Sequence, residues 1–300
     1  MSKNYDQIHR FLFDNANIRG EVLSLRSSYL DACQYQDLPP TAKILLGEFL
    51  AAASLLGEVL KTDGTITLQA RGDGLIPLIM AEIDNKGNLR GIAKVGQGLS
   101  EADILGLDIK KLIGRGVLSL TVDPLKGQRY QGIIEVSGAS LAETLTQYFC
   151  QSEQLPTQVW LHATESFSGG LLLQALPDTV TQSHDSEQWT TATQLATTLT
   201  SEELLTLDHA QILTRLFSEE YNVRIFEPKD LRFSCHCSEE RCHQTLQTLG
   251  EEDVLDLLKT NQSIDISCEF CGHNYRFTED HIKLIFAQSS PKPPSSNTLH

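Results

Sequence analysis

The stretch Cys235-His236-Cys237, with Cys268-Glu269-Phe270-Cys271 after thirty intervening residues, decides how the C-terminal part of this chain folds. Four thiolates delivered as two close pairs can surround one Zn²⁺ tetrahedrally, with each sulfur about 2.3 Å from the metal. The same four sulfurs could instead form two disulfides. The redox state of the surroundings therefore decides between a metal centre and two bridges.

The length and the cysteine content place the chain in a class. Its 300 residues predict two domains, or at most three. No stretch approaches the roughly 20 apolar residues of a membrane span, and residues 1–10 lack the apolar run of a signal peptide. We therefore expect a cytoplasmic protein with reduced thiols. In that setting the seven cysteines indicate metal binding or redox activity rather than structural bridges.

The net charge of −15 is unevenly distributed. Residues 1–177 carry 15 basic and 19 acidic side chains, a net charge of −4, whereas residues 178–300 carry 9 and 20, a net charge of −11. The half that contains the four cysteines should repel phosphate backbones, which argues against a nucleic-acid partner. The same charge should keep the chain in solution if apolar surface becomes exposed.

Residues 1–177 are expected to form an N-terminal α/β core domain of β-sheets and packed helices, which makes the whole chain α+β. Turn signals such as Asp63-Gly64 and Lys126-Gly127 separate the apolar runs. The expected strands are 21–25, 64–68, 76–83, 116–122 and 132–136. Helices are expected at 41–61 and 141–149, and the first is apolar all round, which indicates a buried helix.

Residues 178–229 are expected to be a metastable helical linker. Residues 179–200 are rich in Thr, Gln and Ser, which suits a loop or a weak helix. Thr200-Ser201-Glu202-Glu203 fits a capping box that opens an amphipathic run. The apolar residues of that run are expected on one helical face: Leu204, Leu205, Ile212, Leu216 and Phe217. This stripe needs a surface on which to dock.

Residues 230–287 are expected to be a small zinc-binding domain, and residues 288–300 a disordered tail. Its expected elements are a strand before Cys235, helices at 239–249 and 251–259, a strand ending at Cys268, a strand at 274–277 and a last helix. A unit of about 55 residues has only a marginal apolar core. Structural zinc contributes about 10–16 kcal/mol of apparent binding energy, so its removal should unfold the unit.

Some of the remaining cysteines and histidines are further candidate ligands. Cys242, on the helix after the first pair, is either a buried helix residue, a spare ligand or a reactive thiol. His236, His243 and His273 are alternative ligands, although four cysteines already satisfy the metal. Cys33 and Cys150 lie in apolar settings and are expected to be small core residues.

No catalytic residue can be assigned from the sequence. Gly72-Asp73-Gly74 and Gly96-Gln97-Gly98 lack the third glycine of a dinucleotide fingerprint, and there is no Walker lysine motif. A catalytic zinc needs an open coordination position, which four cysteines do not leave. The chain is therefore not expected to be an enzyme.

Nearly the whole chain resembles the thirty-three-kilodalton bacterial heat-shock chaperone family, the redox-regulated holdases. The decisive match is the two cysteine pairs at the family's spacing, including the non-ligand cysteine in Cys235-His236-Cys237-Ser238-Glu239-Glu240-Arg241-Cys242. Further matches lie in the first domain: Ile18-Arg19-Gly20-Glu21, 45–52, 64–74, 89–91, Arg129-Tyr130-Gln131-Gly132, 148–157 and 169–177.

The resemblance implies an ATP-independent chaperone that is inactive when reduced and loaded with one Zn²⁺. On oxidation, disulfides Cys235–Cys237 and Cys268–Cys271 would form, zinc would leave and the linker would unfold. The exposed linker residues would then hold unfolding client proteins during oxidative stress, and the oxidised form would be a homodimer. No nucleic acid and no membrane is implied.

Three other interpretations remain open from the residues alone. The first is a zinc-ribbon interaction module whose zinc is purely structural. The second is a module that recruits nucleic acid or a transcription partner, against which the charge argues. The third is a thiol oxidoreductase that uses Cys268 and Cys271, although the sequence offers a strand turn there rather than a thioredoxin-like strand and helix.

Overall fold

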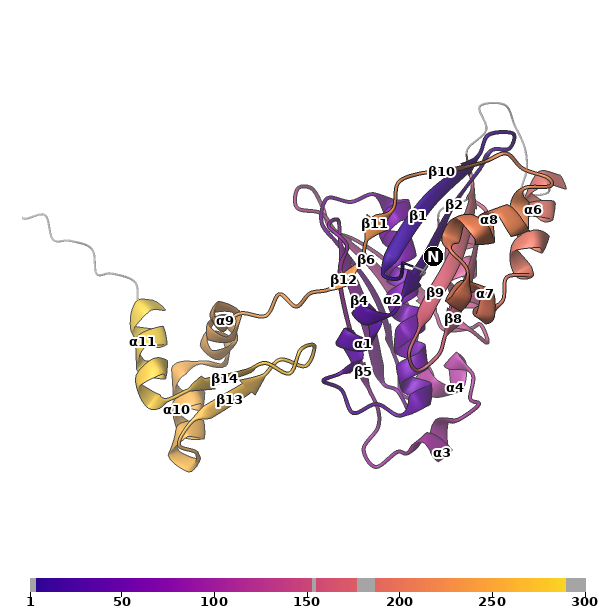
Figure 1. Ribbon diagram of the computed structural model, residues 1–300. Helices are drawn as coiled ribbons and strands as arrows, with labels where there is room; N and C mark the ends of the chain where they lie inside the picture. Colours follow the sequence, from indigo (N-terminus) through magenta and orange to yellow (C-terminus); the bar gives the residue numbers. More distant parts are fainter. Residues whose placement is uncertain (1–3, 153–154, 177–186, 290–300) are drawn as a thin grey trace, which may run out of the picture. The chain divides into compact units, whose positions relative to one another are not determined.

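The computed structural model describes residues 4–152, 155–176 and 187–289, which divide into two compact units, 1–234 and 235–300 (Figure 1). The helices of the expected linker belong to the first unit. The expected boundary at Pro177 and residues 178–186 lie outside the described residues, as do residues 290–300 of the expected tail. Within the described residues, no helix is both long and apolar enough to span a bilayer.

Two six-stranded sheets form the first unit. The first sheet runs β10-β1-β2-β9-β8, with β11 also paired to β1, and the second runs β12-β5-β4-β3-β6-β7. All pairs are antiparallel except β12 with β5. The strands of the first sheet are β1 (Gln7–Phe13), β2 (Ile18–Leu25), β8 (Thr157–Ala163), β9 (Ser168–Ala175), β10 (Val223–Ile225) and β11 (Lys229–Asp230). Those of the second are β3 (Thr65–Arg71), β4 (Leu78–Asp84), β5 (Asn88–Lys94), β6 (Val117–Asp123), β7 (Tyr130–Glu135) and β12 (Arg232–Phe233).

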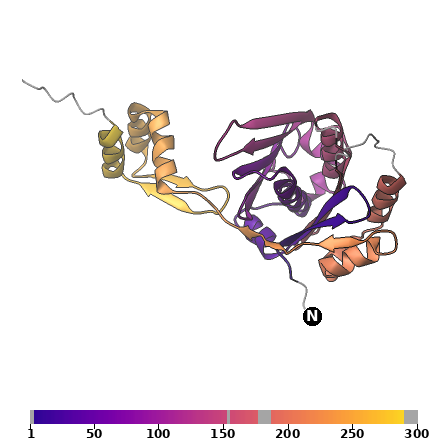
Figure 2. The ribbon, with the colours of Figure 1, turned by 90° about the horizontal axis from the view of Figure 1, so that it is seen from above.

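Helix α2 (Pro40–Leu60) packs against strands of both sheets, and Figure 2 shows it enclosed by them. This position confirms the prediction of a buried helix and explains why its sequence is apolar all round. The helix lies close to β5 because residue 91 is glycine. A Cβ there would lie 3.0 Å from Leu46 Cδ1 and 2.9 Å from the Met80 carbonyl oxygen.

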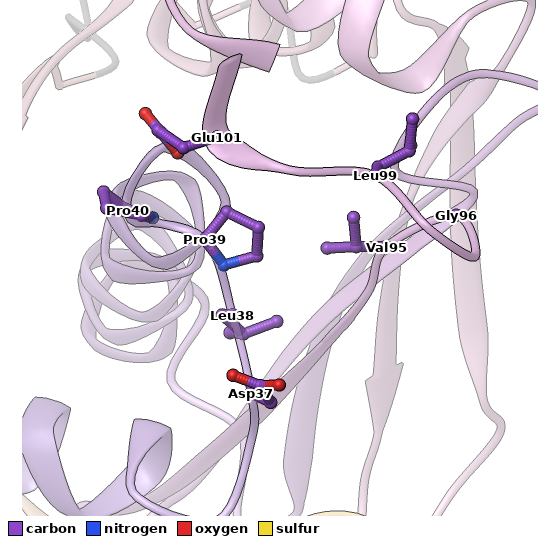
Figure 3. A pocket seen from close by; sticks show the side chains of 8 residues that line it. All are labelled: Asp37, Leu38, Pro39, Pro40, Val95, Gly96, Leu99 and Glu101. Atoms are coloured by element: carbon purple, nitrogen blue, oxygen red, sulfur yellow. The ribbon is translucent and has the colours of Figure 1, made fainter. Parts of the chain in front are cut away.

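The start of α2 is held by a carboxylate from a distant segment. Glu101 Oε2 accepts from the Thr41 N–H at 2.9 Å, and Glu101 Oε1 accepts from the Thr41 hydroxyl at 2.6 Å. A negative group at this position satisfies free N–H groups and suits the helix dipole. Beside it lies a cavity of about 390 Å³, shown in Figure 3 and lined by Asp37, Leu38, Pro39, Pro40, Val95, Gly96, Leu99 and Glu101.

Shorter helices complete the first unit. They are α1 (Ser27–Cys33), α3 (Glu101–Ile104), α4 (Ile109–Ile113) and α5 (Leu141–Ser152). The expected helix at 141–149 is confirmed as α5, and all five expected strands are present as β2, β3, β4, β6 and β7. Strands β1, β5, β8 and β9 were not predicted, nor were β10 and β11, which lie where the expected linker was to be helical. Glycines explain two of these omissions, because Gly91 in β5 and Gly169-Gly170 in β9 lower the strand propensity of segments that packing nevertheless holds extended.

Three helices of the expected linker cover the face of the first sheet that points away from α2 (Figure 1). They are α6 (Glu187–Thr197), α7 (Ser201–Thr206) and α8 (His209–Phe217). Strand β2 serves both sides, since Leu23 and Leu25 pack with α2 whereas Ile18 and Val22 pack with the linker helices. This alternation is the period-two pattern of a strand that is buried on both faces.

The second unit contains a hairpin and three helices around a small core. The hairpin is β13 (Ile264–Ser267) paired with β14 (Asn274–Phe277), and the helices are α9 (Glu239–Leu249), α10 (Glu251–Thr260) and α11 (Glu279–Ser289). The hairpin and the three helices follow the expected order, but the expected strand before Cys235 is β12, which pairs with β5 in the first unit, so the second unit begins at residue 235 and not at 230. One detail of the tail was wrong, because residues 288 and 289 belong to α11. The buried core is six side chains: Cys242, Leu246, Val254, Phe277, Ile282 and Ile285.

Candidate metal centre

The four paired cysteines lie where elements begin or end in the second unit. Cys235 is its first residue, and Cys237 immediately precedes Ser238, the N-cap of α9. Cys268 directly follows β13, and Cys271 lies in the turn that leads to β14. Each pair therefore sits on a short connection whose backbone is fixed by the adjoining element.

The hairpin turn holds Cys268 and Cys271 in one compact loop. The Cys268 N–H donates to the His273 carbonyl at 2.8 Å, and the Gly272 N–H donates to the Cys268 carbonyl at 2.8 Å. Gly272 has a φ of +67°, in the left-handed region that glycine adopts without steric cost. The sequence Cys-Glu-Phe-Cys-Gly thus closes a turn that directs two sulfurs to the same side.

The first pair is fixed by the start of α9. The Ser238 hydroxyl accepts from the Arg241 N–H at 3.3 Å, which caps the helix. Cys237, one residue earlier, therefore lies directly before the first turn of a capped helix.

The four sulfurs converge on one point. All four lie within 4.8 Å of one another, with Cys235 Sγ 3.5 Å from Cys268 Sγ and Cys237 Sγ 3.4 Å from Cys271 Sγ. A tetrahedral zinc with about 2.3 Å bonds requires sulfurs about 3.8 Å apart, whereas a disulfide requires about 2.05 Å. The side chains are thiols and not disulfides, and their spacing fits a tetrahedral metal ion.

The electrostatics of the cluster also call for a cation. Burial raises the pKa of the Cys271 thiol to about 12, against the opposing effect of a backbone hydrogen bond at His273, and hydrogen bonds with the other three thiols add to the increase. Negative charges on neighbouring sulfurs repel one another, so a positive charge among them would be stabilising. A divalent metal ion bound here would supply that charge and take the place of thiol protons.

Tyr275 is part of the site, and the sequence analysis missed it. Its hydroxyl donates to Cys237 Sγ at 3.2 Å, and its ring lies edge-on to His273, with the centroids 4.5 Å apart. Such a donor orients a ligand and moderates its charge. The signal in the sequence was weak, because a tyrosine in a short alternating strand is ordinary strand composition.

The structure places the other candidate ligands outside the cluster. Cys242 is buried in the core of the second unit, which confirms it as a buried helix residue. His243 packs edge-on against Phe277 and lies 3.6 Å from Glu239, while His273 packs against Tyr275. In the described part of the chain, the four cysteines are the one group of three or more His, Cys, Asp or Glu side chains close enough to share a metal ion.

The two remaining cysteines differ from each other. Cys33 is buried in the main core, as expected. Cys150 is exposed, so its prediction as a core residue was wrong. The reason is helical periodicity, since α5 buries Leu145, Tyr148 and Phe149 on one face and residue 150 falls on the other.

The five apolar linker residues all pack on the first sheet. Leu204, Ile212, Leu216 and Phe217 are buried, and Leu205 is partly buried against the same cluster. The capping box is also confirmed, with the Thr200 hydroxyl accepting from the Glu203 N–H at 3.2 Å and the Thr200 N–H donating to Glu203 Oε2 at 2.9 Å. The single helical face was wrong, because the chain breaks at Leu207 and Asp208 into α7 and α8.

Aromatic side chains hold α8 and the chain beyond it on the sheet. Phe13 on β1 stacks on Tyr221, with ring centroids 4.3 Å apart, and also contacts Phe217 at 5.0 Å. The stretch after α8 then returns to the sheets through β10, β11 and β12, with Leu231 buried in the main core and the Ser234 N–H donating to the Leu89 carbonyl at 3.0 Å. This returning segment, residues 223–234, ends immediately before the first cysteine of the metal centre.

A mixed α/β body followed by a small unit with four clustered cysteines defines a class of proteins whose thiols could hold a metal ion. Within that class, the model of the family described as Hsp33 protein matches residues 6–278. The chain therefore belongs to the Hsp33 family, whose members are chaperones and not enzymes.

Two relatives and one solved structure show how far the likeness extends. The 33 kDa chaperonin of Pseudomonas paraeruginosa is 45% identical over 294 residues, which cover 97% of this chain and 98% of that protein. The 33 kDa chaperonin of Azotobacter vinelandii is 43% identical over 296 residues, 98% of each. The crystal structure of the Thermotoga maritima homologue matches with a TM-score of 0.80 over 95% of this chain and 99% of that one; at 22% identity it shows the shared fold.

Proposed function

We propose that this chaperone is a redox-regulated, ATP-independent holdase that binds unfolding proteins during oxidative stress. The observation that carries the proposal is the convergence of four thiols within 4.8 Å in a unit whose core is six side chains. Such a unit depends on its metal for folding, and its ligands are the side chains most open to oxidation. The reduced, metal-loaded form is the inactive one.

The metal is one structural Zn²⁺, held by Cys235, Cys237, Cys268 and Cys271. Four thiolate ligands and tetrahedral spacing favour zinc among the divalent ions of a cell. When bound, the ion supplies about 10–16 kcal/mol of apparent folding energy, more than the small core of the second unit can provide. The order of residues 235–289 therefore follows the occupancy of this site.

Oxidation by a peroxide releases the metal. In each pair, two thiolates lose two electrons and form one S–S bond, while hydrogen peroxide takes up those electrons and two protons to give two waters. The proposed bonds join Cys235 to Cys237 and Cys268 to Cys271. Because each bond lies within one pair, nothing then joins the first pair to the second. The second unit has lost the metal ion that held its two cysteine pairs together.

The returning segment connects this event with the linker. Lys229 Nζ lies 2.5 Å from Glu58 Oε1 on α2, and Arg232 Nε donates to Asn88 Oδ1 at 2.7 Å, just before Cys235. Because Ser234 is bonded to Cys235, order in the second unit restrains the motion of this segment at its C-terminal end. Unfolding of the second unit weakens that restraint and lowers the stability of α6, α7 and α8 on the sheet.

The released linker provides the surface that clients bind. Undocking exposes Leu204, Leu205, Ile212, Leu216 and Phe217, together with the sheet residues beneath them. The −11 charge of residues 178–300 keeps that exposed segment in solution. The active form is a homodimer in the cytoplasm, and neither nucleic acid nor membrane is a partner.

The function is tested by comparing reduced with peroxide-treated protein under gentle heating. Zinc release is followed with a chromogenic chelator, helix content by far-UV circular dichroism, and activity by the aggregation of a thermally unfolding client. We expect oxidised, zinc-free protein to suppress aggregation and reduced protein to be inactive. Equal activity of the two forms would disprove the switch.

Mapping of the disulfides provides a separate test, because the closest sulfurs are not those of the proposed bonds. Bonds across the two pairs, Cys235–Cys268 and Cys237–Cys271, would join the 3.5 Å and 3.4 Å neighbours and keep the second unit closed. The proposed bonds within each pair let it open. Peptide mapping by mass spectrometry after peroxide treatment should find bonds within the pairs, and bonds across them would contradict the proposed route to unfolding.

The alternative is a zinc-ribbon interaction module with a permanently bound, purely structural zinc. One contact favours this alternative, because the Cys237 sulfur accepts a hydrogen bond from the Tyr275 hydroxyl, which makes the sulfur less reactive toward oxidants. The two functions differ in one measurable property. A purely structural centre would keep its zinc during peroxide treatment, whereas the redox switch would release it.

A further inference from the structure

A pair of histidines joins the linker to the sheet on which it docks. His9 Nδ1 on β1 lies 2.8 Å from His209 Nδ1, and His209 is the first residue of α8. The two rings are perpendicular, with centroids 4.9 Å apart. His209 Nε2 lies 3.0 Å from the hydroxyl of Ser24 on β2, which makes His209 the centre of a hydrogen-bonded chain between the linker and two strands.

This arrangement limits the number of protons that the docked pair can hold. A hydrogen bond between two Nδ1 atoms needs one ring that donates and one that accepts. The docked pair can take up one additional proton and keep that bond. A second would place two N–H groups against each other at 2.8 Å, so the docked state holds fewer protons than two separated histidines.

Burial of the two rings opposes a positive charge on the pair. His209 is 4% exposed and lies at the positive end of α8, where a cation is disfavoured. Burial lowers the pKa of His9, and the nearby carboxylate of Glu227 opposes that decrease. Two carboxylates face the pair, those of Glu227, from the segment after β10, and of Asp208, the N-cap of α8, while Ser24 of β2 is neutral.

The pair also lies at an opening through which water can enter. A cavity of about 330 Å³ is lined by Asn4, Gln7, His9, Asp208, His209, Ala210 and Pro228. Protons therefore reach the rings without prior opening of the linker. Asn4 and Gln7, which complete the polar lining, do not titrate.

We propose that the His9–His209 pair is an acid-sensitive latch that releases the linker helices from the first sheet when the pH falls, with the thiols still reduced. Histidines that stay neutral when docked stabilise the docked linker above the ordinary histidine pKa of about 6.5. This stability is lost as the pH falls below that value, because the released histidines then bind protons that the docked pair cannot bind. For each proton that the released pair binds and the docked pair does not, the ratio of released to docked linker rises by up to about tenfold for each unit by which the pH falls. Mild acid then exposes the same apolar surface as oxidation.

The latch does not depend on the redox switch of the proposed function. It needs only the docking of α8 on β1 and β2. The chain carries its own probe of that docking, because its two tryptophans, Trp160 on β8 and Trp189 on α6, are both partly buried against the linker cluster. Trp160 Nε1 also donates to Thr197 Oγ1 on α6 at 3.2 Å.

The experiment uses full-length, reduced, zinc-loaded protein titrated from about pH 7.5 to about pH 5.5. Tryptophan emission reports docking, and a zinc-sensitive dye reports the metal centre in the same samples. We expect a reversible red shift in emission while zinc stays bound. The variant His9→Gln/His209→Gln should lose that shift, whereas His281→Gln, in the second unit, should keep it.

Two results would overturn the latch. One is an unchanged red shift in the double variant. The other is loss of the shift in His162→Gln, since His162 lies 2.9 Å from Ser201 on α7, burial lowers its pKa, and it would then be the sensor.

A measurement on the wild-type protein covers the case in which the double variant does not dock at neutral pH. The imidazole ¹⁵N shifts of His9 and His209 are followed through the same titration. We expect the two rings to become fully protonated only together with the red shift. Full protonation of both rings while the emission stays unshifted would contradict the latch.

Discussion

Among single residues, Tyr275 provides a sharp test of the metal centre. Its hydroxyl donates to Cys237 Sγ, and loss of such a donor commonly weakens metal binding by about tenfold or more. Tyr275→Phe keeps the ring against His273 and removes only that hydrogen bond. We expect zinc affinity, measured by chelator competition, to fall about tenfold.

Tyr130→Phe is the matched control, because the Tyr130 hydroxyl is hydrogen-bonded to the Tyr148 hydroxyl in the first unit, away from the four cysteines. Zinc affinity should not change in this variant. Equal affinities for Tyr275→Phe and wild type would mean that the Tyr275 hydroxyl does not support the ligand.

Two cysteines outside the four-cysteine cluster should differ in their response to substitution by serine. Cys242 lies in the core of the second unit, where a hydroxyl without a partner costs about 1–3 kcal/mol. Cys242→Ser should therefore lower the thermal stability of that unit and leave one zinc bound per chain. Cys150→Ser, on an exposed position, should change stability by less than about 0.5 kcal/mol. Loss of zinc stoichiometry in Cys242→Ser would show that Cys242 is a ligand.

The same residues show what sequence could settle at this scale. The ligand set followed from pairs of cysteines at close spacing, a pattern that owes nothing to tertiary packing. The exposure of Cys150 and the contact of Tyr275 with a sulfur depend on which face of an element meets a neighbour. Apolar neighbours in sequence do not reveal that face.

Among the elements, α8 carries the docking of the linker. Leu216→Glu places a carboxylate in the apolar cluster beside Phe217, and we expect about 3 kcal/mol or more of lost docking stability. Reduced protein with this change should be cleaved faster by protease between residues 187 and 222, and it should suppress client aggregation without oxidant. Thr214→Glu adds the same charge on the exposed face of α8 and should behave as wild type. Protease resistance equal to wild type in Leu216→Glu would remove the linker from the mechanism.

Elements with strong local signals were predicted well, whereas several strands whose own sequence carries little signal were not. The capping box at Thr200 and the all-apolar pattern of 41–61 contain their own evidence, and both were confirmed. Strands β1 and β8 carry charged or polar residues within short apolar runs, and they are strands because β2 and β9 pair with them. Long-range pairing of this kind cannot be inferred from a local period. The break between α7 and α8 was likewise set by Asp208, which caps a new helix in the middle of an apolar stripe.

For the whole molecule, the division into two units explains how one chain can combine a stable body with a responsive end. The first unit buries α2 between two sheets and has a large apolar core. The second has six buried core residues and four thiols. Sequence predicted this contrast through the cysteines and the short length after residue 230. The packing of the linker on the first sheet became clear only from the structure, because an apolar stripe does not identify the surface on which it packs.

The dependence of the second unit on its metal is tested most directly by hydrogen–deuterium exchange of the reduced protein with and without a strong chelator. We expect removal of zinc to abolish protection of the amides in 239–289, to lower it in α6, α7 and α8, and to leave α2 unchanged. Amides in 239–289 that stay protected after complete loss of the metal would show that the second unit does not need it.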